Sequence, residues 1–320
     1  MVNLCLEIFN TEYVEMNMKT SAVVVTYNRL AMLQEVIHAL QASKTPVDHI
    51  IVVDNNSNQD TQDYLTSLGE QIEYVRLNQN LGGAGGFNRG VRYFMEKTED
   101  DFVWLMDDDT VPHSYTLTEL TKYAEANPKF GFLSSDVRWI DGQRALMNKP
   151  ALLSHHSTLD DDGTEPVQLR NATFVSLLMS RNVIGKIGLP ITDFFIWGDD
   201  IEYTERAGRL YPGYLIPTAK VTHKMATNVG SNIVTDSKDR TPRYYYSYRN
   251  KIYYGRKRDF VGHVKSNVRI TLEFLRLLSV PHVENRIGKI KVLISGVKDG
   301  MKFKPVIEFA SQSRQNSRDN

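Results

Sequence analysis

Residues 102–110 read FVWLMDDDT, an apolar run that ends at three consecutive carboxylates. An apolar run of this length, closed by turn-forming residues, predicts a buried strand with the aspartates where it leaves the sheet. Open α/β sheets bind their ligands at this edge. Because neighbouring carboxylates repel one another, Asp107, Asp108 and Asp109 favour a bound cation. A solvated acidic turn is the alternative, and this stretch alone does not exclude it.

Three earlier segments have the same design. Residues 21–29 (SAVVVTYNR), 49–57 (HIIVVDNNS) and 72–77 (IEYVRL) are apolar runs that lead into polar residues. Apolar residues at helical spacing follow the first of them. Strands that alternate with helices predict an α/β fold with a mostly parallel sheet flanked by helices. Right-handed crossovers then place the polar loops at one edge of the sheet.

A glycine-rich stretch, LGGAGGFNRG, occupies residues 81–90 and precedes a helix expected over residues 91–97. Glycines let the backbone approach a ligand closely, and a helix N-terminus directs amide groups at phosphate. The spacing matches neither the dinucleotide fingerprint nor the P-loop. A flexible glycine turn is the alternative for this stretch.

Composition narrows the class of protein. The chain has 320 residues, a formal net charge of zero and ordinary hydrophobic and charged fractions, as expected of a globular protein. We expect no nucleic acid partner. Cys5 is the only cysteine, so we predict a reducing compartment and assign the residue no role. The first twenty residues lack a secretory signal pattern, and no apolar run is long enough to cross a bilayer, so any membrane contact should be peripheral.

Two later regions carry further acidic and histidine residues. We interpret residues 142–170 as a long, partly mobile insertion, and its His155, His156 and Asp160–Asp162 as solvated rather than metal-binding. Residues 194–203 read FFIWGDDIEY and lead into a helix expected over residues 200–210. Carboxylates suit the first turn of a helix, which explains the acidity but not the tryptophan and glycine before it. Short strands are expected at residues 214–217 and 219–223.

The last part of the chain differs in composition. After a polar link over residues 227–240, the sequence predicts helices to about residue 310, with apolar residues at helical spacing among many lysines and arginines. This pattern suits either an anionic membrane surface or a helical pair packed on the rest of the protein. We therefore expect an N-terminal extension (1–20), a catalytic domain (21–226), a C-terminal helical region (227–310) and a disordered tail (311–320).

Taken in order, these motifs resemble family 2 inverting glycosyltransferases of GT-A fold. They are VTYNR (25–29), VDN (53–55), NLGGAGGF (80–87), DDD (107–109), WGDDIEY (197–203) and His223. The closest resemblance is to bacterial galactofuranosyltransferases and their rhamnosyltransferase relatives, and it covers about residues 21–251. It implies a Rossmann-like sheet with a C-terminal helical extension.

The resemblance also implies roles for individual residues. Asp200 would be the general base, and Asp107, Asp109 and His223 would hold Mn²⁺ or Mg²⁺. The acceptor would contact Trp197, Asp199, Arg249 and Asn250. The donor would be bound by residues of the first two loops, the glycine stretch and the aspartate triad: Thr26, Asn28, Arg29, Asp54, Asn80, Gly82, Gly83, Gly85, Gly86, Asp107 and Asp108.

The activity implied is transfer of galactofuranose from UDP-galactofuranose to a glycan or lipid-linked acceptor, at the inner face of the cell membrane. The expected partners are thus a nucleotide-sugar donor, that acceptor and the membrane surface, and an oligomer is compatible with the sequence. A rhamnosyltransferase that uses dTDP-rhamnose is the alternative within the class. A non-catalytic subunit that binds sugar nucleotide or glycan, and a nucleotidyltransferase, are the alternatives outside it.

Overall fold

The computed structural model describes residues 18–153, 159 and 163–311 of the chain. Its centre is a mixed sheet of ten strands with the order β3-β2-β1-β4-β9-β6-β10-β8-β7, and β5 pairs with β10. The strands are β1 (Thr20–Thr26), β2 (His49–Asp54), β3 (Glu73–Arg76), β4 (Phe102–Asp107), β5 (Thr110–Pro112), β6 (Phe132–Trp139), β7 (Ala151–Leu152), β8 (Val167–Asn171), β9 (Leu177–Ser180) and β10 (Gly213–His223).

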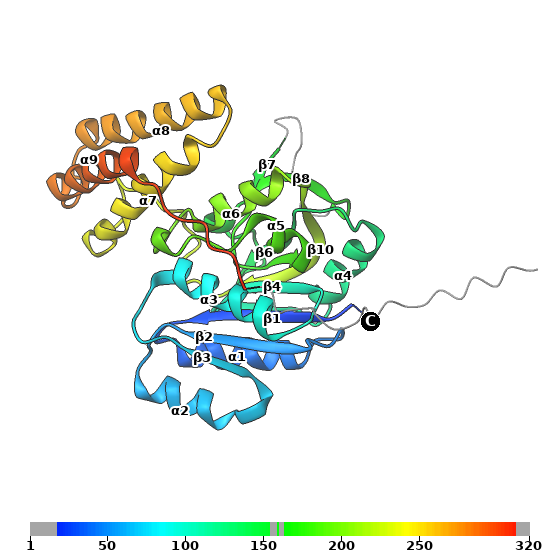
Figure 1. Cartoon of the computed structure of the whole chain (residues 1–320). Coiled ribbons are helices and arrows are strands. Elements are labelled where there is room, and N and C mark those ends of the chain that lie inside the picture. The colour runs from blue at the N-terminus through cyan, green and yellow to red at the C-terminus, as the bar shows by residue number, and fades with distance from the viewer. Residues whose placement is uncertain (1–17, 154–158, 160–162, 312–320) are drawn as a thin grey trace, which may run out of the picture.

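Helices cover both faces of this sheet, as Figure 1 shows. The α-helices are α1 (Leu30–Gln41), α2 (Gln59–Ser67), α3 (Gly82–Lys97), α4 (Thr116–Ala126), α5 (Arg181–Ile187), α6 (Asp199–Gly208), α7 (Thr241–Gly255), α8 (Phe260–Ser279) and α9 (Arg286–Lys302). Short 3-10 turns are η1 (Gly69–Gln71), η2 (Leu146–Asn148), η3 (Thr192–Phe194) and η4 (Lys238–Arg240). The predicted α/β architecture is confirmed.

The alternation of β1 explains the two layers of the core. Ala22 and Val24 face the cluster that contains α1 and α4, whereas Val23 and Val25 face the cluster that contains α3 and α5. All four are buried. A central parallel strand is covered on both faces, which is why its sequence is continuously apolar rather than alternating.

The expected start of the third helix is wrong. Residue 91 is not its beginning, because α3 already starts at Gly82 and the glycines form its first turns. Close packing overrides the low helix propensity of glycine. A Cβ atom at Gly86 would lie 2.4 Å from Val25 Cγ1, and one at Gly90 would lie 2.3 Å from Val23 Cγ1. The glycines therefore let α3 lie directly on β1.

Two other expectations are corrected. Residues 142–170 are not simply an insertion, because β7 and β8 within them extend the sheet beyond β10. His155, His156 and Asp160–Asp162 lie outside the described residues. The two short strands expected at residues 214–217 and 219–223 are one strand, β10, with an irregularity between Ile216 and Lys220.

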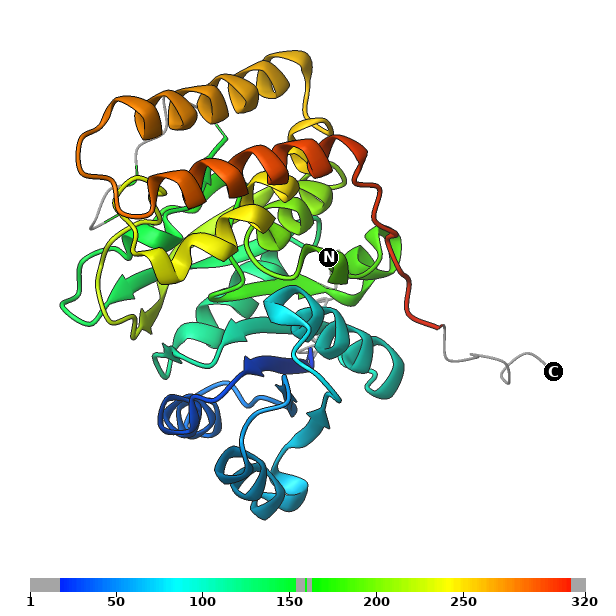
Figure 2. The ribbon, with the colours of Figure 1, turned by 90° about the vertical axis from the view of Figure 1, so that its left-hand side faces the viewer.

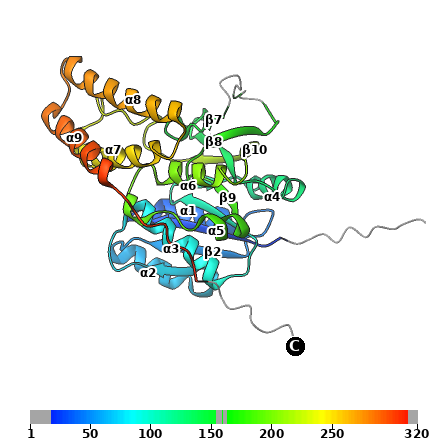
Figure 3. The same cartoon turned by 45° about the horizontal axis from the view of Figure 1, so that its top comes forward.

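The helices α7, α8 and α9 pack together beside the sheet (Figures 1 and 3). They share a small core that includes Tyr244, Tyr248, Ile270, Leu277 and Leu293. Helix does not continue to residue 310 as expected, because α9 ends at Lys302.

Residues 303–310 run back in extended form to the sheet domain, along the red trace in Figure 1. The Leu189 amide donates to the Glu308 carbonyl at 2.8 Å, and Asn88 Nδ2 donates to the Glu308 carboxylate at 2.9 Å. This segment ties the helical region to the sheet domain.

Candidate active site

The ends of β4 and β10 meet at one edge of the sheet. Val25 of β1 lies opposite Asp107, the last residue of β4. The short strand β5 then folds back so that Thr110 lies opposite His223, the last residue of β10. The sheet register therefore brings Asp109 and His223 together, although more than a hundred residues separate them.

Asp107, Asp109 and His223 form a group that fits a metal ion. One potential ligand atom from each lies within 4.8 Å of the others, and His223 Nε2 is 2.9 Å from Asp109 Oδ1. Carboxylate oxygens with one imidazole nitrogen suit Mn²⁺, and a set dominated by oxygen also suits Mg²⁺. These are the three residues predicted as metal ligands from the sequence.

The middle aspartate has a different environment from its neighbours. Asp108 accepts hydrogen bonds from Thr26 Oγ1 at 2.8 Å and from the Tyr27 amide at 3.3 Å. Arg29 Nη1 bridges Asp108 at 3.2 Å and Asp109 at 2.6 Å. Asp108 thus connects the loop that follows β1 to the group of Asp107, Asp109 and His223. Arg29, whose side chain is 51% exposed, remains accessible to a ligand.

The charge balance of the site favours a cation. Burial, together with the charge of Asp109, raises the pKa of Asp107 to about 7. Burial also raises the pKa of Asp108 to about 6, against the opposing charge of Arg29. Burial opposes ionisation of Asp109 as well, but His223 and Arg29 outweigh it and lower that pKa. A divalent ion would supply the positive charge that Arg29 alone leaves short.

Asn148 is a site residue that the sequence did not reveal. Its Oδ1 lies 2.7 Å from His223 Nδ1, and its Nδ2 donates to Thr173 Oγ1 at 3.3 Å. The amide oxygen makes Nδ1 the donor nitrogen of the ring and turns Nε2 toward Asp109. Asn148 therefore fixes the orientation of the His223 ring within the group that fits a metal ion. It belongs to η2, in a polar segment without periodicity, so no sequence pattern marks it.

We expect Asn148→Ala to weaken metal binding by about tenfold to a hundredfold, because the imidazole loses the partner that orients it. Titration of the protein with Mn²⁺, followed by electron paramagnetic resonance, measures this directly. Asn148→Asp keeps an oxygen acceptor and should retain most of the affinity. Equal affinities for wild type and Asn148→Ala would contradict the orienting role.

The first two loops are braced internally. Asp54 is fully buried and accepts from the Ser57 amide at 2.7 Å and from Tyr74 Oη at 3.0 Å. Asn28 has a left-handed backbone with φ of 57°, and its Oδ1 accepts from the Asn58 amide at 2.7 Å. Both side chains shape the loops, and their direct contact with the donor stays a prediction.

The predicted donor residues of the glycine stretch fall into two groups. Asn80 Oδ1 accepts from the Gly82 amide at 2.8 Å, and Gly85 and Gly86 are buried by close packing. Gly83 has no atom within 4 Å of where its Cβ would be, so its backbone faces open space. Gly83 is therefore the glycine best placed to approach a ligand.

The loop before α6, residues 195–198, has a strained backbone and is hydrogen-bonded to the start of α3; we call it the strained loop. Phe195 and Trp197 have left-handed φ values of 61° and 63°, and Gly198 has a φ of 92°. The Phe195 carbonyl accepts from the Ala84 amide at 3.2 Å in the first turn of α3. Left-handed backbone at bulky residues costs about 1–3 kcal/mol each and is concentrated at functional sites. This loop positions Asp199 and Asp200, the first two residues of α6, near the sheet edge.

Asp199 and Asp200 are the two acids at the start of α6, and Asp199 interacts electrostatically with both Asp200 and Asp107. Burial, followed by the charges of Asp200 and Asp107, raises the pKa of Asp199 well above its usual range. Burial raises the pKa of Asp200 to about 6, although backbone amides, including that of Ile201 at 2.7 Å, oppose the rise. Asp200 has no cation partner among the described residues, so it can accept a proton from a ligand.

Asn250 holds the strained loop in place. It is fully buried on α7, and its Nδ2 donates to the carbonyls of Phe194 at 3.0 Å, Ile196 at 3.3 Å and Trp197 at 2.8 Å. Its amide nitrogen is thus committed to the backbone, and its Oδ1 accepts from the Arg249 side chain at 3.1 Å. An effect of Asn250 on acceptor binding would act through the loop, and its predicted contact with the acceptor remains untested.

We expect Asn250→Ala to lower the free energy of unfolding by about 2–4 kcal/mol, because it leaves buried carbonyls without donors. Thermal and urea unfolding measure the loss. Asn267→Ala, on the outer helix α8, is the matched control and should change stability little. A variant as stable as the wild type would show that the loop does not depend on Asn250.

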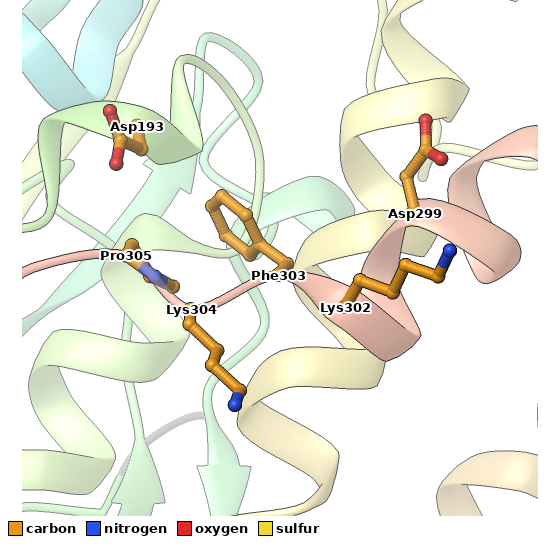
Figure 4. Close-up of a pocket in the computed structure, with 6 residues that line it drawn as sticks. All are labelled: Asp193, Asp299, Lys302, Phe303, Lys304 and Pro305. Atoms are coloured by element: carbon orange, nitrogen blue, oxygen red, sulfur yellow. The ribbon is translucent and has the colours of Figure 1, made fainter.

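Arg249, the neighbouring residue, lies between the loop and the end of α9. It donates to the Asp193 carbonyl, and its guanidinium lies 4.1 Å from the centre of the Phe303 ring. Figure 4 shows the adjoining open pocket, of about 330 Å³, lined by Asp193, Asp299, Lys302, Phe303, Lys304 and Pro305.

Trp197 packs edge-on against Tyr244, with ring centres 5.1 Å apart. Roles of Arg249 and Trp197 at the acceptor stay predictions.

Sequence comparison finds related transferases. The chain is 27% identical over 246 residues to galactofuranosyltransferase GlfT1 of Mycolicibacterium smegmatis, a match that covers 72% of this chain and 81% of that protein. It is 26% identical over 247 residues to dTDP-rhamnosyl transferase RfbF of Shigella flexneri, covering 73% of this chain and 79% of that protein.

Structural comparison supports the fold. GalNAc-T7, solved with UDP, GalNAc and Mn²⁺, matches with a TM-score of 0.58 and 12% identity, covering 87% of this chain and 55% of that one. Staphylococcus aureus TarS matches with a TM-score of 0.51 and 13% identity, covering 89% of this chain and 44% of that one. These likenesses are too remote to indicate more than a shared fold.

The family comparison is decisive for the class of protein. The model of glycosyl transferase family 2 matches residues 21–188, which include β1 to β9 and the aspartate triad. The resemblance inferred from the motifs is therefore confirmed, and with it the transferase class. The chain belongs to glycosyltransferase family 2.

Proposed function

We propose that this transferase moves galactofuranose from UDP-galactofuranose to a glycan or lipid-linked acceptor in cell-surface polysaccharide synthesis, with inversion and with a divalent metal. The observation that carries the chemistry is the grouping of Asp107, Asp109 and His223 at the sheet edge, electrostatically coupled through Asp199 to Asp200. The relationship to GlfT1 supports the choice of sugar.

The proposed mechanism is a single displacement. Asp200 takes the proton of the acceptor hydroxyl as its oxygen attacks the sugar, and the diphosphate leaves from the opposite face. Asp107, Asp109 and His223 would hold Mn²⁺ or Mg²⁺, and the ion would supply positive charge against the charge that develops on the leaving diphosphate. Arg29 and the backbone at Gly83 would contact the donor. No second catalytic carboxylate is needed.

A donor screen tests this proposal. The full chain, with Mn²⁺ or Mg²⁺ and a panel of glycan and lipid-linked acceptors, should release UDP from UDP-galactofuranose and little from UDP-glucose. Release of dTDP from dTDP-rhamnose, with none of UDP, would make the enzyme a rhamnosyltransferase. The relationship to RfbF is the observation that favours this second candidate.

The same screen addresses the alternatives outside the class. A non-catalytic subunit would bind UDP without turnover, and Asp200→Asn would then leave its properties unchanged. A nucleotidyltransferase would release pyrophosphate from a nucleoside triphosphate and a sugar phosphate. The unpaired carboxylate of Asp200 supports the transferase over the binding subunit, because binding alone needs no base.

We also propose that the enzyme works as a peripheral protein at the inner face of the cell membrane, where a lipid-linked acceptor would be available. Among the described residues, no helix is both long and apolar enough to span a bilayer. The catalytic domain would comprise residues 21–226 and the acceptor- or membrane-associated region residues 227–310. The returning segment 303–310 would couple the two.

A further inference from the structure

The outer side of α8 has an exposed apolar stripe that no part of the described chain covers. Its members are Phe260, Val261, Val264, Val268, Leu272, Leu275 and Leu278. Phe260 is 81% exposed, and the other six are between 41% and 55% exposed. At 3.6 residues per turn, the seven side chains fall within a sector of about 120°. We call this set the α8 stripe.

Basic residues lie along one edge of the α8 stripe. Lys265, Arg269 and Arg276 are exposed and occupy the next sector of about 40° on the same helix. None of them forms an ion pair within the described part of the chain. Glu273, the only acidic residue of α8, faces inward, where it accepts from Tyr248 Oη at 2.7 Å and from Lys251 Nζ at 3.4 Å. The exposed side of α8 is therefore apolar and cationic, without acidic groups.

The α8 stripe is separate from the side of the helix that stabilises the fold. Ser266, Ile270 and Leu277 are buried on the opposite side, and the latter two belong to the core shared with α7 and α9. Figures 1 and 2 show α8 as the outermost of the three helices, away from the sheet. Packing thus accounts for one side of α8 and leaves the α8 stripe unexplained.

We infer that the α8 stripe and its basic edge dock on the surface of an anionic lipid bilayer, with the helix lying in the plane of the interface. Apolar side chains would enter the boundary of the acyl chains while Lys265, Arg269 and Arg276 contact anionic headgroups. An α8-to-α8 contact with a second copy of the chain is a poorer fit, because α8 offers those cations no exposed acid. The inference deepens the proposed function, on which it rests for the lipid-linked acceptor.

The test is co-sedimentation of the full chain with phosphatidylcholine vesicles that contain or lack phosphatidylglycerol. We expect binding to the anionic vesicles that weakens as salt is added. Val268→Ser/Leu272→Ser/Leu275→Ser should reduce the partition coefficient at least about tenfold. Lys265→Gln/Arg269→Gln/Arg276→Gln should reduce it by about fivefold for each charge removed. Unchanged far-UV circular dichroism and thermal unfolding show that these variants are folded.

Matched controls use the same changes elsewhere on the surface. Ile140→Ser/Leu210→Ser and Lys97→Gln/Lys122→Gln/Lys129→Gln alter exposed side chains outside α8 and should bind as the wild type does. Equal binding of the α8 variants and these controls would overturn the inference. Light scattering that shows a dimer abolished only by the serine variant, with vesicle binding unchanged, would assign the stripe to self-association instead. Because sedimentation needs no donor, a failed donor screen would not affect the result.

Discussion

Asp200→Asn is expected to lower kcat for transfer by about a thousandfold, since the acceptor hydroxyl loses the carboxylate that takes its proton. Affinity for UDP should change little, because the side-chain hydrogen bond of Asp200 is to the Ile201 amide and an amide oxygen can replace it. UDP release measures kcat, and calorimetry measures UDP affinity. A loss of affinity equal to the loss of rate would place Asp200 in donor binding instead.

Asp193→Asn provides the matched control for this variant. Asp193 is an exposed acid of η3, just before the strained loop, and its carboxylate interacts with the charge of Arg249 but forms no hydrogen bond or salt bridge among the described residues. The same chemical change there should leave kcat within about twofold of the wild type, as expected for a surface substitution away from the chemistry. If both variants lost activity alike, the effect would come from disturbance of the loop rather than from the base.

The raised pKa of Asp200 predicts that the rate of transfer depends on pH. A general base acts as the carboxylate, and burial raises the pKa of Asp200 to about 6. The rate should therefore rise as pH increases through about 6 and level off above it. Measured from pH 5 to 8, the residual activity of Asp200→Asn should lack this acidic limb. A limb that persists in the variant would assign the titration to another group.

The sequence predicted the sheet edge because its signals are local. Apolar runs that stop at polar residues placed Asp107 and Asp54 at strand ends, and parallel topology then placed those ends together. The beginning of α3 was not predictable from local propensity, since glycine is a poor helix former. Only the contact of Gly86 and Gly90 with β1 explains a helix there.

Long-range contacts were not predictable from the sequence. Asn148 and His223 are 75 residues apart and have no shared motif, so nothing local shows that one orients the other. Asn250 bonds from α7 to the strained loop, a contact that no local pattern marks, and its contact with the acceptor stays a prediction. The sequence predicted the apolar pattern of α8. Which of its apolar residues are buried depends on how α8 packs against α7 and α9. Local patterns predict the secondary structure of a segment, whereas tertiary packing decides which residues it contacts.

Removal of the metal is expected to abolish transfer, and Mn²⁺ or Mg²⁺ should restore it. Asp109→Asn should be inactive and not restored, because it loses the charge that faces both His223 and Arg29. A divalent ion at this position would stabilise the leaving diphosphate by several kcal/mol, so the loss should exceed about a hundredfold.

The effect of Mn²⁺ on the unfolding temperature tests this prediction without turnover. Mn²⁺ should raise the unfolding temperature of the wild type, because it binds only the folded arrangement of Asp107, Asp109 and His223. It should not raise that of Asp109→Asn, whereas Asp141→Asn, an exposed acid beyond β6, should respond as the wild type does. Full activity of the chelated wild type would show that protein side chains such as Arg29 suffice for the diphosphate. The pairing of Arg29 with Asp109 and the raised pKa of Asp107 argue against that outcome, since this group of acids already lacks positive charge.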